Sequence, residues 1–122
     1  MKKIVILVLF IALLLSSCFL DTETTKTIKY EVTGTANTAS ITMRNKDGNT
    51  EQISSVTIPW ETTFSVKLNL EGYDAFFAYI SAQNNGQTGS VTSKIFVNGN
   101  EFQTATSSGA YVIATASGSV KP

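Results

Sequence analysis

The sequence predicts an all-β domain built from two antiparallel sheets, preceded by a helical segment at the N-terminus. Three observations favour this fold class. From Ile28 onward apolar and polar residues alternate, which is typical of strands with one buried face. Turn-forming pairs such as Asp47-Gly48 and Asn98-Gly99 separate the alternating segments, which recur about every 8–12 residues. No helical stretch follows the N-terminal segment.

Each expected strand ends at a turn or at a residue that breaks the ladder. Pro59 ends the third strand because proline lacks the N–H that a ladder hydrogen bond needs. We expect turns at residues 46–49, 71–74 and 98–100, and the most flexible loop at residues 84–89. Seven or eight such strands favour an immunoglobulin-like sandwich. The positions that define the strands are Ile28, Tyr30 and Val32; Ala39, Ile41 and Met43; Ile53 and Val56; Phe64, Val66, Leu68 and Leu70; Val91, Ile95 and Val97; Phe102, Thr104 and Thr106; and residues 111–115.

The segment AFFAYISA (residues 75–82) is apolar on both faces, which indicates a central strand or one whose outer face is covered. Together with Tyr73, it places four aromatic rings within seven residues. If Phe77 and Tyr79 face away from the core, they form an exposed apolar patch of the kind that marks interaction sites. The alternative is that they lie between two packed layers, which requires no ligand.

Trp60 follows Pro59 and is a further candidate for contact with a partner, because an exposed indole is a common interface anchor. The alternative is that the indole closes one end of the core, with its N–H bonded to a carbonyl.

The first seventeen residues have the features of a secretory signal peptide. Lys2 and Lys3 supply a positive start, and residues 4–15 form an unbroken apolar run that small residues follow. This run is short for a membrane span, which needs about 17–25 residues. The lysines in front of it keep the N-terminus cytoplasmic and send the rest of the chain across the membrane.

Cys18 is the only cysteine in the chain, and it directly follows this segment. The tetrapeptide Leu15-Ser16-Ser17-Cys18 resembles the bacterial lipobox, in which the cysteine sulfur is diacylated and the chain is cut just before it. We therefore predict a lipoprotein signal peptide at 1–17, a lipidated N-terminus and flexible tether at 18–27, and the β-sandwich at 28–120. An uncleaved signal anchor is the alternative.

The charge of the mature chain limits its partners. Removal of Lys2 and Lys3 leaves seven basic against nine acidic side chains. Nucleic-acid binding needs a clustered basic surface, so we expect no nucleic-acid partner. We expect the lipid to hold the domain on the extracytoplasmic side of a bacterial membrane, at the outer membrane or cell surface in a Gram-negative organism. The sequence leaves the oligomeric state open.

Catalysis has few candidate residues in this chain. Histidine is absent, and the acidic residues stand singly near strand ends and turns rather than in apolar settings that would tune their pKa. The oxygen-rich residues 45–49 lack the distal glutamate of a calcium loop and are predicted to form a hairpin turn. We therefore expect no enzyme activity, no metal site and no cofactor.

Four stretches, in order along the chain, resemble one protein family. They are YEVTGTANTASIT (30–42), VTIPW (56–60), ISAQNNGQTGSVTSKIFVNG (80–99) and TSSGAYVIATASG (106–118). Together they are similar to the mycobacterial membrane protein small (MmpS) family. The resemblance implies an extracytoplasmic β-sandwich that serves as an accessory subunit of large RND-type transporters, which export lipids and siderophores.

The chain departs from that family at two points. The resemblance implies a cysteine pair at the positions of Ser93 and Ala116, and this chain has neither cysteine. The lipoprotein-like signal ending at Cys18 replaces the family's transmembrane anchor. We therefore expect a membrane-anchored, non-catalytic binding or accessory module, with an RND-type envelope transporter or another membrane protein as partner. The alternative is a stand-alone surface lipoprotein that binds a small apolar ligand, a glycan or a host component.

Overall fold

The computed structural model describes residues 22–122, and these residues form eight β-strands and no helix. The predicted signal peptide, its helix and Cys18 lie outside the described residues. All paired strands are antiparallel, so the predicted all-β fold of two antiparallel sheets is confirmed. The strands are β1 (Glu23–Thr33), β2 (Thr38–Arg44), β3 (Thr50–Thr57), β4 (Trp60–Asn69), β5 (Phe76–Asn84), β6 (Ser90–Val97), β7 (Asn100–Ser108) and β8 (Ile113–Val120).

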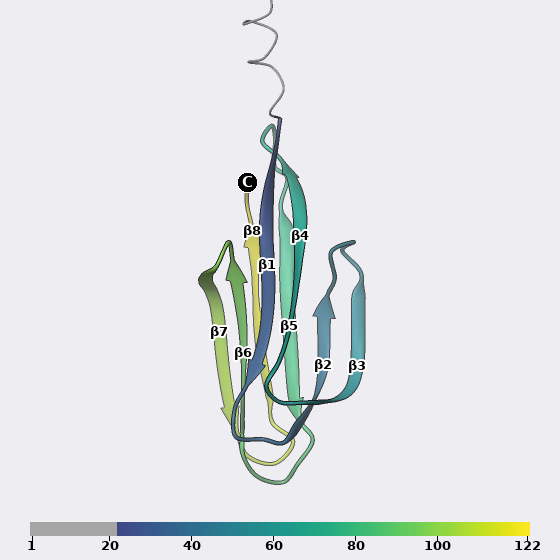
Figure 1. Cartoon of the computed structure of the whole chain (residues 1–122), viewed down its shortest axis with the longest axis vertical. Coiled ribbons are helices and arrows are strands. Elements are labelled where there is room, and N and C mark those ends of the chain that lie inside the picture. Colours follow the sequence, from purple (N-terminus) through teal and green to yellow (C-terminus); the bar gives the residue numbers. More distant parts are fainter. Residues whose placement is uncertain (1–21) are drawn as a thin grey trace, which may run out of the picture.

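The strands divide into two four-stranded sheets. Sheet A has the order β4-β1-β6-β7, and sheet B has the order β3-β2-β5-β8 (Figure 1). The hairpins β2–β3 and β6–β7 stay within one sheet, whereas the other connections between these strands cross to the opposite sheet. In an immunoglobulin domain the first two strands are neighbours. Here β1 and β2 lie in different sheets, so the sandwich architecture is as predicted but the strand order differs.

The connections gather at two ends of an elongated molecule (Figure 1). The β4–β5 turn and the start of β1 lie at one end, which we call the N-terminal end. The β1–β2, β3–β4, β5–β6 and β7–β8 connections lie at the opposite, far end. The segment that precedes residue 22 therefore joins the domain at the N-terminal end.

The core lies between the sheets and is built from the inward residues of the alternating strands. The central strand β5 shows the pattern: Phe76, Ala78, Ile80 and Ala82 are buried, while the residues between them point outward. Both sheets bury large side chains, including Ile41 and Ile80 of sheet B, and sheet B adds several small ones, so that a close-packed interior is filled. Sheet A contributes Ile28, Tyr30, Val32, Val91 and Ile95, and sheet B contributes the alanines 39, 78, 82, 114 and 116.

The first strand starts earlier than the sequence predicts. Residues 23–27, expected in the tether, pair with the last residues of β4, from Glu23 opposite Asn69 to Thr27 opposite Ser65. This part of β1 carries threonine and lysine rather than alternating apolar residues, so the sequence shows no hydrophobic pattern that would predict a strand there. The sandwich begins at Glu23, and only residues 19–22 remain between it and Cys18.

Three other predicted boundaries also need correction. Leu70 was expected on the core face of the fourth strand, but it lies beyond the last β1–β4 pair and is exposed. The final strand was expected at 111–115, but Tyr111 has a positive φ of 56° in the preceding turn, and β8 continues to Val120. Asn84, assigned to a flexible loop, is the last residue of β5 and is buried.

The Asn84 side chain organises the far end of the molecule. Its Nδ2 donates to the carbonyls of Thr88 and Gly109 at 2.9 and 3.0 Å, and its Oδ1 accepts from the Gly86 N–H at 2.8 Å. One buried amide therefore satisfies backbone groups of both the β5–β6 and the β7–β8 connections, which its burial requires.

Two buried hydroxyl groups connect the sheets. Tyr30 extends from sheet A, and its hydroxyl donates to the Arg44 carbonyl at 2.8 Å and accepts from the Tyr79 N–H at 3.3 Å, both in sheet B. Ser93 of β6 is fully buried, and its Oγ donates to the Ala114 carbonyl of β8 at 2.9 Å. These bonds cross the interior at sites where an unpaired polar group would cost about 1–3 kcal/mol.

Replacing Ser93 with alanine should lower the free energy of unfolding by about 1 kcal/mol, because the buried hydrogen bond from Ser93 Oγ to the Ala114 carbonyl is lost. Ser81 is a matched control, since its Oγ bonds to Thr115 Oγ1 at 3.1 Å on the exposed face of sheet B. Ser81→Ala should change stability by no more than about 0.5 kcal/mol. Urea unfolding of both variants provides the comparison, and equal losses would contradict the role assigned to Ser93.

Replacing Tyr30 with phenylalanine should destabilise the fold at neutral pH and also change its pH dependence. Burial raises the pKa of Tyr30 to about 12, above the usual tyrosine value of 10.0. The folded state therefore retains a proton that the unfolded state loses between pH 10 and 12, and stability falls as the pH rises through this window. At about 1.36 kcal/mol per pKa unit, the wild type should lose up to about 3 kcal/mol more than Tyr30→Phe.

Chemical unfolding of both proteins at pH 9 and pH 12 measures this difference. Parallel pH dependence of the two proteins would show that the Tyr30 hydroxyl does not stay protonated in the folded state.

Candidate functional site

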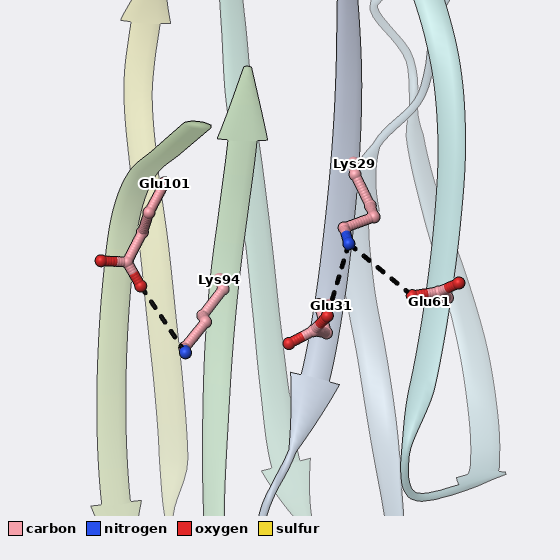
Figure 2. A network of polar contacts seen from close by, with 5 residues as sticks. All are labelled: Lys29, Glu31, Glu61, Lys94 and Glu101. Atoms are coloured by element: carbon pink, nitrogen blue, oxygen red, sulfur yellow. Dashed lines mark ion pairs between the residues drawn. The ribbon is translucent and has the colours of Figure 1, made fainter. Parts of the chain in front are cut away.

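On the outer face of sheet A, five charged side chains are paired with one another (Figure 2). Lys29 Nζ lies 3.6 Å from a Glu31 carboxylate oxygen and 3.9 Å from one of Glu61, and Lys94 Nζ lies 3.6 Å from Glu101. Partly exposed ion pairs contribute about 0–1 kcal/mol each, because water screens them. These residues make a solvated surface whose charges are neutralised locally, and they do not form a site.

The outer face of sheet B has a different chemistry. Arg44, at the end of β2, is the one charged side chain that points outward from the four described strands of this sheet. The other outward positions carry mainly hydroxyl and amide groups, with two aromatic rings on β5. The polar members are Ser40, Thr42, Gln52, Ser81, Gln83, Thr115, Ser117 and Ser119.

Arg44 and the two β5 rings meet at one place on this face. With Thr42 and Thr50 they line a shallow hollow of about 330 Å³, named the β2–β5 hollow here. The Arg44 guanidinium carbon lies 5.5 Å from the centroid of the Phe77 ring, a cation–π arrangement. Phe77 is 44% exposed and Tyr79 is half-buried, so both face away from the core.

Arg44 holds a fixed position in the hollow, but its charge is not neutralised there. Its Nη1 donates to the Gly48 carbonyl at 2.8 Å, which ties the guanidinium to the β2–β3 turn. Its Nε is buried and has no hydrogen-bond partner among the described residues. No carboxylate is found among the residues that line the hollow. The hollow therefore offers a cation and two aromatic faces to a group that can accept hydrogen bonds.

Tyr30 supports the hollow from inside the core. Pairing between β2 and β5 ends at Met43 opposite Ile80, so the next pair in this register would be Arg44 opposite Tyr79. The Tyr30 hydroxyl instead bonds to the backbone of both residues. It thus fixes the two backbone positions from which the Arg44 and Tyr79 side chains project.

The four aromatic residues that the sequence suggests for contact with a partner do not lie together in the structure. Phe77 and Tyr79 share the β2–β5 hollow, but Trp60 lies at the start of β4 at the far end. Trp60 is half-buried, packs against the core and lines a separate hollow of about 360 Å³ with Pro59. This position agrees with the core-closing interpretation. Tyr73 is fully exposed on the β4–β5 turn, and Cys18 lies outside the described residues.

Arg44 and Tyr30 are the members of the site that sequence reasoning missed. Arg44 is the only arginine in the chain and directly precedes a predicted turn, a signal that could have singled it out. Tyr30 fits an apolar alternation, which predicts a core residue. No pattern in the sequence shows which backbone groups its hydroxyl bonds to.

The described residues limit the chemistry of the site. Within residues 22–122, no three His, Cys, Asp or Glu side chains are grouped so that they could hold a metal ion. The same part of the chain also has no helix with the length and hydrophobicity needed to cross a bilayer.

Comparison with known proteins places the chain in a family. A family model described as Mycobacterium membrane protein matches residues 19–118, which include nearly all of both sheets. No curated protein matches the chain significantly. The match agrees with the resemblance found in the four sequence stretches and indicates a membrane-associated role. The chain therefore belongs to the Mycobacterium membrane protein (MmpS) family.

Proposed function

We propose that this protein is a lipoprotein of the bacterial cell envelope and a non-catalytic accessory module for an RND-type transporter. The observation that carries the proposal is the position of the family match. It begins at residue 19, directly after the cysteine of the lipobox-like tetrapeptide. The family domain thus follows the residue that lipidation would make the mature N-terminus.

Tethering is the mechanism that this arrangement supports. A lipid at Cys18 confines the domain to a thin layer beside the membrane, which raises its effective concentration for any neighbouring membrane protein. Two or three acyl chains make such anchoring stable, because each buried methylene contributes about 0.8 kcal/mol. The sandwich itself needs to bind its partner only weakly.

The β2–β5 hollow is the docking surface of this proposal. Arginine and aromatic residues are enriched at protein interfaces and often contribute most of their binding energy. Arg44 presents a positive charge that no carboxylate of the hollow neutralises, so an acidic side chain of the partner is the complementary group. Phe77 and Tyr79 add apolar area beside that charge.

A glycan at the same hollow is the second candidate. Hydroxyl and amide side chains dominate the outer face of sheet B, and they suit a sugar chain that stacks on the two aromatic rings. In that case the domain would act as a stand-alone surface module rather than as a transporter subunit.

Replacing Cys18 with serine should abolish lipid attachment and cleavage before residue 18, because a serine hydroxyl is far less nucleophilic than a thiolate. The mass of the mature protein and its distribution between membrane and soluble fractions measure the result. Ser17→Ala keeps a small residue before the cysteine and should be lipidated normally. A Cys18→Ser protein still cut at the same bond would refute the lipoprotein assignment.

A photo-crosslinking phenylalanine analogue at position 77 should capture a large envelope protein in cells. The matched control is position 96, where Phe96 lies on the outer face of sheet A beneath Lys29. Adding Arg44→Ala should reduce the product about tenfold or more, as expected for loss of an interface anchor. Equal products from both positions would contradict docking at the hollow, and capture of glycan alone would favour the second candidate.

A further inference from the structure

The β4–β5 turn, residues 70–75, exposes two large side chains at the end of the molecule where the chain enters. Tyr73 is fully exposed, and Leu70 is 51% exposed. In Figure 1 this turn lies beside the start of β1, above the rest of the sandwich. Apolar side chains displayed together on a turn mark a contact surface rather than a folding requirement.

Hydrogen bonds hold the conformation of the turn and attach it to the first described residue. The Leu70 N–H donates to the Thr22 carbonyl at 2.7 Å, and the Glu71 N–H donates to Asn69 Oδ1 at 3.1 Å. The Asp74 carboxylate folds back to accept from the Asn69 N–H at 2.7 Å. These bonds fix the position of the turn relative to the residues that lead from the tether into β1.

The length of the tether places this turn near the membrane. β1 starts at Glu23, so four peptide steps separate Cys18 from Thr22. Four residues span at most about 14 Å when fully extended. A lipid at Cys18 would therefore hold Thr22, and the turn bonded to it, within that distance of the bilayer surface.

We propose that the β4–β5 turn is a second membrane contact, in which Leu70 and Tyr73 enter the interfacial region of the lipid surface. This inference rests on the proposed lipid attachment at Cys18. A tyrosine ring suits the interface, since its apolar body and polar hydroxyl match the boundary between acyl chains and headgroups. The turn carries Glu71 and Asp74 but no basic residue, so the contact depends on apolar burial and requires no anionic lipid.

Two contacts would fix the orientation of the domain relative to the bilayer, whereas a lipid anchor alone would leave the domain free to reorient. With both Cys18 and the turn at the surface, the long axis of the sandwich stands away from the bilayer. Trp60 then lies far from the membrane, about 30 Å along β4 from Asn69.

Tryptophan fluorescence with brominated lipids tests this orientation. The full-length, lipidated chain is placed in vesicles of phosphatidylcholine with brominated acyl chains, which quench nearby indoles. Wild type reports on Trp60, the only tryptophan in the chain. A Tyr73→Trp/Trp60→Phe variant reports on the turn. Its emission should be quenched about twofold or more, because an interfacial ring lies close to the acyl chains, while wild-type emission should be unchanged.

Each outcome decides a different claim. If the variant binds vesicles but its indole is not quenched, the second contact is refuted and the proposed lipid attachment is unaffected. If the chain does not float with the vesicles, both the proposed lipid attachment and the second contact that rests on it are refuted. Adding Leu70→Ser to the reporter should weaken quenching. If Trp60→Phe prevents folding, Tyr73→Trp alone should lose about a quarter of its emission or more, because only one of its two indoles lies at the interface.

Discussion

The arrangement of this sandwich depends on one buried hydroxyl group, that of Tyr30. It leaves sheet A, crosses the core and bonds to the backbone of two neighbouring strands of sheet B. A buried hydroxyl must find partners, so sliding one sheet over the other would leave three polar groups unpaired. Ser93 adds a second crossing bond to Ala114. In relatives the resemblance implies a cysteine pair near this place, and a disulfide acts mainly on the unfolded chain. Here the hydroxyl bonds of Tyr30 and Ser93 connect the sheets, and they stabilise the folded state rather than restrict the unfolded chain.

The same hydroxyl links the core to the candidate site. It replaces a ladder bond between Arg44 and Tyr79, the two residues whose side chains then line the β2–β5 hollow. The contrast with sheet A is one of charge pairing. Lys29 and Lys94 are neutralised by glutamates of their own face, whereas Arg44 finds a ring and a carbonyl but no carboxylate. An unneutralised cation beside aromatic rings is suited to a partner, and the paired face is suited to solvent.

The sequence predicted those parts of the fold that burial controls. Alternation placed Ile28, Val32 and Ile41 in the core correctly, because one buried face imposes a period of two. It could not find the first residues of β1, where pairing with β4 involves backbone rather than apolar side chains. It also could not show that Asn84 is buried, since one partner of its amide, the Gly109 carbonyl, belongs to a connection that is distant in sequence. For the site, the aromatic pattern of β5 predicted Phe77 and Tyr79 but not Arg44, whose position depends on a turn and a ring that only folding brings together.

The position of the hollow along the molecule supports the proposed partner. Arg44 is the last residue of β2 and Phe77 the second of β5, so both lie at strand ends directed toward the N-terminal end. A domain held at that end by a short tether, as proposed, presents this hollow nearer to the bilayer than the far end of the molecule. The hollow beside Trp60 lies at the far end and would face away from the membrane. A partner embedded in the membrane can reach the first hollow with a short extracytoplasmic segment. For this reason the anchoring geometry favours Arg44, Phe77 and Tyr79 over Trp60 as the surface that meets a transporter.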